Sequence, residues 1–188
     1  MDLAVLCVSK TQDDKMYGDA RRKEKQGSLG TSEPFCHANR PGLLPPAPDF
    51  RGKLYVAPLT TVGNMPFRRA CIRHGADITV SEMAMASNLL KGDRKEWALV
   101  RRHPSEKIFG VQVCGGYPDL MARCGELLDT QVQCDFVDIN MGCPIDGVCA
   151  KGAGASLFKD EVGLKRCELT VRATSRAMKK TPLTIKIR

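Results

Sequence analysis

The sequence has few aromatic residues, few histidines and no long apolar run. Phe, Trp and Tyr make up 5% of the 188 residues, and there are three histidines. None of the nine cysteines forms a CxxC pair. Because structural zinc sites need closely spaced Cys and His ligands, we expect no metal. A membrane-spanning helix needs about 20 consecutive apolar residues. The apolar run at the amino terminus, in MDLAVLCVSK, is far shorter, so we expect no membrane partner.

The cysteines point to a reducing compartment. Their number is odd, they are spread along the chain, and the sequence shows no secretory signal. We therefore expect a cytoplasmic protein, with the nucleus as a second location.

The chain is basic, with a formal net charge of +8 at pH 7. Such a charge favours a polyanionic partner, and nucleic acid is the commonest, followed by an anionic cofactor. A solvated basic surface explains the charge equally well. The charge by itself says nothing about the fold.

The composition divides the chain near residue 50. Residues 1–50 are mostly polar, charged or proline-bearing, with the basic run RRKEK at 21–25 and the stretch PGLLPPAP at 41–48. This composition predicts a disordered or loosely attached extension. Residues 51–188 carry the apolar pattern of a folded domain.

Strand-like and helix-like segments alternate through that domain. Short apolar runs predict strands at 54–58, 77–81, 108–113, 136–140 and 183–187, and helical patterns fill the intervals, including 83–90 and 95–102. Apolar runs joined by helices indicate an α/β fold with a parallel sheet and right-handed crossovers. No GxGxxG follows the first strand, which disfavours a dinucleotide-binding Rossmann domain. We expect a TIM (β/α)8-barrel type, with about its first five β/α units present.

Polar residues lie at the predicted carboxyl ends of several strands: Thr60, Gln112, Asn140 with Cys143, and Lys186. In a barrel these ends converge on one mouth, where active sites form. A lysine there could hold a delocalised anion, and a glutamine could hydrogen-bond a flat heterocycle. The stretch FVDINMGCPIDGVCAKGAGASL at 136–157 is therefore the candidate site.

Cys143 has three interpretations. It could be an inert core cysteine; a nucleophile, which needs a base to form thiolate; or a general acid, which needs a protonated thiol. No histidine in the sequence is an obvious activating base, which favours the general acid. Lys151 with Gly152 and Gly154 could form a basic lip beside this turn or be an ordinary glycine-rich loop.

At these residues the chain resembles the tRNA-dihydrouridine synthases, which are flavin enzymes on a TIM barrel. The matching segments occur in the family's order and cover about residues 53–188. They are APLTTVGNMPFRR (57–69), DITVSEMAM (77–85), FGVQV (109–113), VDINMGCPIDGV (137–148), KGAG (151–154) and LTIKIR (183–188). The APLTT and INMGCPID wording most resembles the eukaryotic type 3 branch.

The resemblance implies a role for each matching residue. Pro58, Leu59 and Thr60 would lie under the flavin, and Gln112 and Lys186 would bind FMN. Asn140 would contact uracil, and Lys151 and Arg188 would hold substrate or RNA. NADPH would reduce FMN, hydride would pass to uracil C6, and Cys143 would give its proton to C5. The expected partners are thus tRNA and NAD(P)H.

The family's barrel continues through three further strands and a tRNA-docking helical domain, so we expect the chain to be a fragment or truncated product. Two other functions remain open at this point. One is an FMN barrel oxidoreductase that acts on free pyrimidines, and the other is an inactive, truncated RNA-binding fragment. Comparing free uracil with tRNA as substrate distinguishes the first alternative from a tRNA-dihydrouridine synthase. A flavin spectrum in the purified protein would count against the second.

Overall fold

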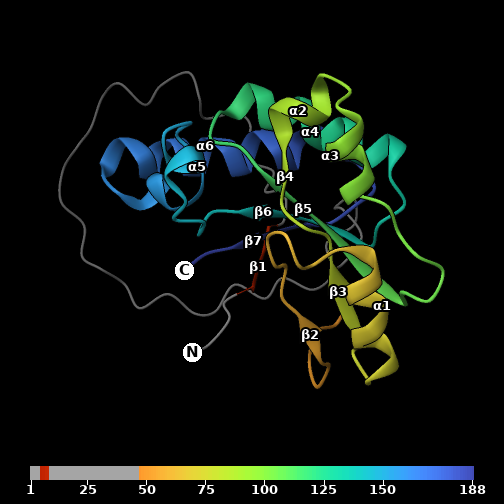
Figure 1. The fold of residues 1–188 in the computed structure, drawn as a ribbon. Helices are drawn as coiled ribbons and strands as arrows, with labels where there is room; N and C mark the ends of the chain where they lie inside the picture. Colours follow the sequence, from red (N-terminus) through yellow and green to blue (C-terminus); the bar gives the residue numbers. More distant parts are fainter. Residues whose placement is uncertain (1–4, 9–46) are drawn as a thin grey trace.

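The structure, a computed structural model, describes residues 5–8 and 47–188 (Figure 1). The predicted extension at 1–50 therefore lies mostly outside the described residues. Four of its residues, Val5–Val8, form strand β1, which the sequence pattern did not predict. The backbone of β1 pairs antiparallel with the last strand of the domain.

The remaining elements follow the expected alternation of strands and helices. The strands are β2 (Tyr55–Val56), β3 (Ile78–Val80), β4 (Ala84–Met85), β5 (Ile108–Cys114), β6 (Phe136–Asn140) and β7 (Leu183–Lys186). The helices are α1 (Met65–Arg73), α2 (Ala86–Leu90), α3 (Arg94–Leu99), α4 (Pro118–Gln131), α5 (Asp146–Cys149), the 3-10 helix η1 (Gly154–Phe158) and α6 (Glu161–Ala177).

The described strands form one sheet in the order β1-β7-β6-β5-β3-β2, with β4 also pairing with β5. Apart from β1, every pairing is parallel. Strands β2, β3, β5, β6 and β7 succeed one another in chain order, without the reversal of order that marks a doubly wound sheet. This arrangement confirms an α/β fold with a parallel-strand half-barrel.

Three local predictions need correction. Residues 83–85 were predicted helical, but Ala84–Met85 form strand β4, and Glu96 Oε2 accepts a hydrogen bond from the Met85 N–H at 2.9 Å. Helix α3 ends at Leu99 rather than at residue 102, and the carbonyl of Arg101 beyond it accepts from Arg68 Nη2 at 2.9 Å. The loop expected around Lys151, Gly152 and Gly154 is correct for the first two residues, but Gly154 already begins η1. The short helix α5 just before this loop was not predicted.

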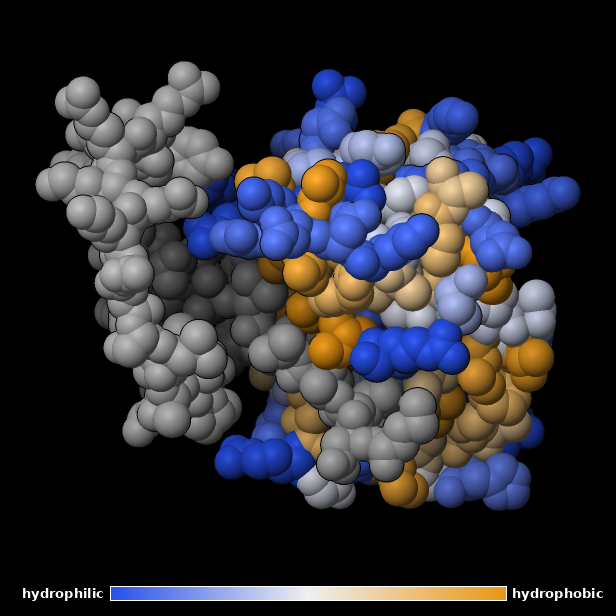
Figure 2. Space-filling view, turned by 90° about the vertical axis from the view of Figure 1, so that its left-hand side faces the viewer, coloured by the Kyte–Doolittle hydropathy of each residue, from blue (hydrophilic) through white to orange (hydrophobic). Residues whose placement is uncertain are grey.

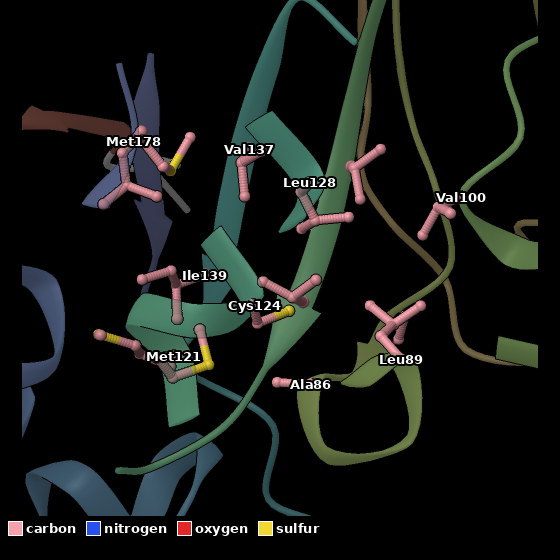
Figure 3. Packing of buried hydrophobic residues seen from close by; sticks show 14 of the residues in the cluster. Ala86, Leu89, Val100, Met121, Cys124, Leu128, Val137, Ile139 and Met178 are labelled. Atoms are coloured by element: carbon pink, nitrogen blue, oxygen red, sulfur yellow. The ribbon is translucent and has the colours of Figure 1, made fainter. Parts of the chain in front are cut away.

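The main hydrophobic core lies between the sheet and helices α2, α4 and α6. Figure 3 shows Cys124 and Leu128 of α4 beside Val137 and Ile139 of β6, with Met178 from the end of α6 closing the cluster. These side chains are buried, as their helical and strand spacing predicted. The core fixes the sheet from one side and leaves its other face for the site.

A second, polar anchor ties α1 to the sheet. The Arg68 and Glu106 side chains are 2% and 0% exposed, and Arg68 Nε lies 2.7 Å from Glu106 Oε1. The same oxygen accepts from Thr79 Oγ1 of β3 at 2.7 Å. The Arg68 guanidinium also lies over the Phe109 ring, 4.9 Å from its centroid. Burial by itself would raise the pKa of Glu106, but hydrogen bonds from Arg68, His103 and Thr79 hold it below its ordinary value.

No helix in the described part of the chain combines the length and the apolar character that crossing a membrane requires.

Candidate functional site

The sheet face opposite the main core changes character along the strands. Near the amino ends of the strands it is apolar, with Ile78, Val80 and Phe136 packed together. Toward the carboxyl ends the side chains that share this face become polar. They are Gln112 on β5, Asp138 and Asn140 on β6, and Thr184 and Lys186 on β7.

Strand register brings these polar residues together. Asp138 lies between Gln112 and Thr184 in the ladder, and Asn140 lies beside Lys186. Since side chains two residues apart on a strand share a face, the polar row runs across three strands. The prediction that Gln112, Asn140 and Lys186 converge at the strand ends is thus supported by the geometry.

A continuous set of hydrogen bonds connects the row. Asp138 Oδ1 accepts from Thr184 Oγ1 at 2.7 Å, and Asp138 Oδ2 accepts from Gln112 Nε2 at 2.7 Å. Gln112 Oε1 in turn accepts from Asn140 Nδ2 at 3.0 Å. A carboxylate accepts only, so Asp138 determines that the Gln112 amide nitrogen faces it and that the amide oxygen faces Asn140.

The Asn140 amide connects Gln112 to the turn after β6. With its nitrogen engaged by Gln112, Asn140 directs Oδ1 to the backbone N–H groups of Gly142 and Cys143, at 3.1 and 2.9 Å. An asparagine that bonds the backbone two and three residues on stabilises a tight turn. Asn140 therefore fixes the position of Cys143 relative to the polar row.

Asp138 is the acid of the row, and its pKa is raised above the ordinary value of an aspartate. Burial raises its pKa, while the hydrogen bonds from Gln112 and Thr184 and the charge of Lys186 act in the opposite direction without cancelling the effect. Burial, together with the charge of Asp138, also raises the pKa of Tyr55. The polar row thus lies in a low-dielectric environment.

Cys143 is 8% exposed and packs with Cys114, Val148 and Ala153, against Met83 and Met85. Its carbonyl accepts from the N–H of Ala155 at 2.9 Å, which holds the following loop against the turn. Of the two histidines in the described region, His103 bonds Ser105 and His74 is exposed at the end of α1. Neither is hydrogen-bonded to Cys143, so neither is placed to act as its base.

Lys186 is a partly buried cation at the end of β7. No carboxylate in residues 47–188 lies within ion-pair distance of it, although the charge of Asp138 is close enough to interact. A cation in this position suits a ligand that carries delocalised negative charge. Together with the amides of Gln112 and Asn140, it gives the donors, acceptor and positive charge that a flavin ring would require.

Arg188 lies beside the same turn, whereas Lys151 lies farther along its loop. A Cβ added to Gly142 would meet the Arg188 backbone N at 3.2 Å, so the two segments are in close contact. Arg188 also lines a pocket with Ala155, Phe158 and Ile187. Both Lys151 and Arg188 have exposed side chains, as residues that contact a large substrate would need.

Pro58, Leu59 and Thr60 are not joined to the polar row. They lie in the loop between β2 and α1, where the Leu59 carbonyl accepts from the Gly63 N–H at 2.9 Å. Leu59 is 44% exposed. Strand β3 separates β2 from β5, and no hydrogen bond connects these three residues to Gln112 or Asn140 in the described region.

The sequence interpretation missed Asp138 and Thr184. Both interrupt apolar strands, and both stand two residues before a residue that was selected: Asp138 before Asn140 and Thr184 before Lys186. This two-residue spacing was a signal that could have identified them. Within the described residues, no group of three or more His, Cys, Asp or Glu side chains is placed to hold a metal ion.

Comparison with known proteins gives a consistent result. The model of the family "Dihydrouridine synthase (Dus)" matches residues 55–188. Three relatives, each called "tRNA-dihydrouridine(47) synthase [NAD(P)(+)]-like", are 59% (Oryza sativa subsp. japonica), 55% (Arabidopsis thaliana) and 54% (Homo sapiens) identical to the chain over 140 residues. These matches cover 74% of the chain but only 20–21% of each relative, so the chain spans about one fifth of their length. With the family model matching most of its length, the chain belongs to the dihydrouridine synthase family.

Proposed function

We propose that this chain carries the catalytic part of a tRNA-dihydrouridine synthase, which reduces the C5–C6 double bond of a uridine in tRNA with FMN and NADPH. Family membership and the names of the relatives support the reaction and the NAD(P)H reductant. The observation that carries the proposal is the Gln112–Asn140–Cys143 arrangement, in which one amide fixes the other and the second fixes a turn that ends in a thiol.

The residues divide the work by position. Gln112 and Lys186 would hold the flavin ring, and Pro58, Leu59 and Thr60 would complete its site. When bound, reduced FMN supplies the hydride for uracil C6. Asn140 holds the uracil, and Cys143 gives its thiol proton to C5. Lys151 and Arg188 bind the RNA around the target.

A general acid must reach the atom that it protonates, within about 2.6–3.2 Å in the bound complex. Asn140 Oδ1 accepts a hydrogen bond from the Cys143 N–H, which fixes the backbone of the turn that carries the thiol. A target uridine in folded tRNA must also leave its stack to reach this turn, at a cost of a few kcal/mol.

Several finer assignments belong to the same proposal. The branch is the eukaryotic type 3 branch, which the APLTT and INMGCPID segments most resemble. The fold is a TIM (β/α)8 barrel, of which residues 51–188 form the first five β/α units, preceded by a loosely attached extension at 1–50. The protein acts in the cytoplasm, with the nucleus as a second location. The seven cysteines within residues 47–188 are free.

The test uses Cys143→Ala in a protein that contains the whole barrel, with Cys149→Ala as its matched control. Cys149 is the last residue of α5, and its Sγ donates to the Cys143 carbonyl oxygen at 3.6 Å. Cys143→Ala should keep the flavin absorbance but lose about 10²–10⁴-fold in uridine reduction, the usual contribution of a general acid. Cys149→Ala should keep most of the activity.

Normal turnover by Cys143→Ala would remove this thiol from the mechanism. Faster reduction of free uracil than of tRNA would favour an FMN barrel oxidoreductase acting on free pyrimidines. RNA binding without any flavin in the purified protein would favour an inactive RNA-binding fragment.

A further inference from the structure

A pair of residues outside the site described above shares a loop with it. Tyr117 lies immediately before α4, and Arg166 lies in the first half of α6. The Arg166 guanidinium carbon lies 5.3 Å from the centroid of the Tyr117 ring, within range of a cation–π contact. Neither residue was selected from the sequence, because 49 positions separate them along the chain.

The loop after α5 connects this pair to Cys143. A Cβ added to Gly152 would lie 3.2 Å from Arg166 Nη2 and 3.4 Å from Tyr117 Oη, so the loop backbone touches both side chains. Three residues later, the Ala155 N–H donates to the Cys143 carbonyl at 2.9 Å. One short segment therefore borders both the thiol and the Tyr117–Arg166 pair.

Among the residues that the structure describes, Arg166 has no counter-ion. Within residues 47–188, no carboxylate lies within ion-pair distance of it, and its buried Nε has no hydrogen-bond acceptor. Arg172, two turns farther along α6, instead donates to Glu168 at 3.0 Å. A partly buried guanidinium that is stacked but unpaired is well suited to an external anion, and the planar group favours phosphate.

Tyr117 extends this recognition beyond a simple anion. Its side chain remains 50% exposed although Arg166 covers part of the ring. An exposed aromatic ring beside a cation is the usual arrangement for stacking an unpaired base while the charge contacts its backbone. A site for free phosphate alone would not need the exposed ring.

The surrounding surface is compatible with a large, partly apolar ligand. Figure 2 looks onto the side of the molecule that carries α5 and the beginning of α6, and it shows hydrophilic residues next to hydrophobic ones. Ile145, which precedes α5, and Val162, in the first turn of α6, are 50% and 71% exposed. The exposed Lys151, which immediately precedes Gly152, adds a second positive charge.

From this geometry we infer that Tyr117 and Arg166 form an RNA-contact site beside the Cys143 turn. Arg166 binds a backbone phosphate, and Tyr117 stacks on the base or ribose of a nucleotide that neighbours the uridine at Cys143. This inference rests on the proposed function for the identity of the nucleic acid as tRNA. The site itself would recognise any unpaired RNA segment whose phosphate reaches Arg166.

The test measures RNA binding in the absence of flavin and NADPH. Fluorescence anisotropy of a labelled, unmodified tRNA transcript is recorded with the 188-residue chain and its variants at several salt concentrations. Arg166→Gln removes the charge and should weaken binding about fivefold to tenfold and reduce the salt slope by about 0.7–1, the effect of one lost phosphate contact. Arg172→Gln, on the same helix, is the matched control and should stay within about twofold, because Arg172 is already paired with Glu168.

Two substitutions at Tyr117 separate stacking from the hydroxyl group. Tyr117→Phe should bind RNA like the unaltered chain, whereas Tyr117→Ala should lose roughly tenfold through the missing stack. Tyr117 is half-exposed, so its substitution remains informative if circular dichroism shows that Arg166→Gln is unfolded.

Three results would overturn the inference. The first two are no tRNA binding by the unaltered chain, and equal tRNA binding by Arg166→Gln and Arg172→Gln. The third is that the variants bind tRNA normally but bind NADPH more weakly, as measured by the fluorescence of NADPH. Failure of the proposed function gives a different pattern. In that case Arg166 and Tyr117 would still determine RNA binding, although the whole barrel would not reduce uridine.

Discussion

Gln112 on β5 donates its amide Nε2 to the Asp138 carboxylate on β6 at 2.7 Å, and both side chains are 1% exposed. This contact determines which end of the Gln112 amide faces Asn140, and Asn140 then holds the Cys143 turn. Asp138 itself does not need to touch a ligand. It positions the amides of Gln112 and Asn140, which contact the flavin and the uracil in the proposed function.

Two substitutions at Asp138 should therefore differ. Asp138→Leu removes the acceptor for Gln112 Nε2 and Thr184 Oγ1, at about 1–3 kcal/mol of unfolding free energy for each donor left unpaired. Asp138→Asn keeps an acceptor oxygen for Gln112 and should retain the fold. Chemical denaturation measures the loss, and an FMN titration should show weaker binding only for the Leu variant. Identical behaviour of the two variants would contradict a positioning role.

The pH dependence of stability should also depend on Asp138. Folding raises the pKa of its carboxyl, mainly through burial, so the folded protein holds this proton more tightly than the unfolded chain. Its contribution to stability is complete below the unfolded pKa, near 4, and is lost as the pH rises through the folded pKa. Asp138→Asn lacks this titration.

As the pH rises above about 4, the unfolding free energy of Asp138→Asn should therefore increase relative to that of the unaltered chain. The gap should grow by about 1.4 kcal/mol per pH unit until the folded pKa is passed. Urea denaturation at pH 4, 5.5 and 7.5 measures it. The lowered pKa of Glu106 affects both proteins equally and cancels in the difference. A gap that is constant or shrinks with pH would refute the burial argument.

The buried Arg68–Glu106 pair should be a major determinant of stability. Arg68→Met leaves the Glu106 carboxylate buried with only Thr79 and the His103 N–H as partners. Breaking such a pair costs about 3–5 kcal/mol, and adding Glu106→Gln to the same chain should restore part of it. Thermal and urea denaturation measure both effects.

Arg172→Met is the control for that experiment. Arg172 pairs with Glu168 at 2.9 Å, but both side chains are more than half exposed. An exposed pair of this kind contributes about 0.3–0.5 kcal/mol. Equal losses in Arg68→Met and Arg172→Met would show that burial does not set the value of the Arg68 pair.

Close packing of the Cys143 loop predicts a sharp difference between two glycines. A Cβ on Gly116 would overlap the Gly152 carbonyl oxygen, whereas a Cβ on Gly147 would meet nothing within 4 Å. Gly116→Ala should therefore lower the free energy of unfolding by about 1–3 kcal/mol, a typical cost of overpacking. Gly147→Ala should be neutral or slightly stabilising, because it lies in α5 without a left-handed φ. Denaturant titrations of the two variants check this, and a Gly116→Ala variant as stable as Gly147→Ala would disprove the close approach.

Much of the fold could be predicted from local patterns. The apolar runs at 108–113 and 136–140 became β5 and β6 because a strand buried on both faces needs continuous apolar residues. Pro118 begins α4, as a proline without an N–H suits the first helical turn. The same reasoning placed Gln112, Asn140 and Lys186 at strand ends. The prediction of a helix at residues 83–85 was wrong, because the Glu96 carboxylate accepts from the Met85 N–H and holds that segment extended.

What the sequence alone determined was the order of the elements and the chemical type of residue at each strand end, since both depend on spacings of two to four residues. The tertiary structure decided which of those residues meet. Gln112 and Asp138 are 26 positions apart, Asp138 and Thr184 are 46 apart, and β1 pairs with β7 across most of the chain. Such contacts depend on strand register and on the packing of whole helices, which no local spacing encodes. For that reason Cys143 could be selected from the sequence. The role of Asp138, and the contact between Arg166 and Tyr117 beside the Cys143 loop, became visible only in the folded chain.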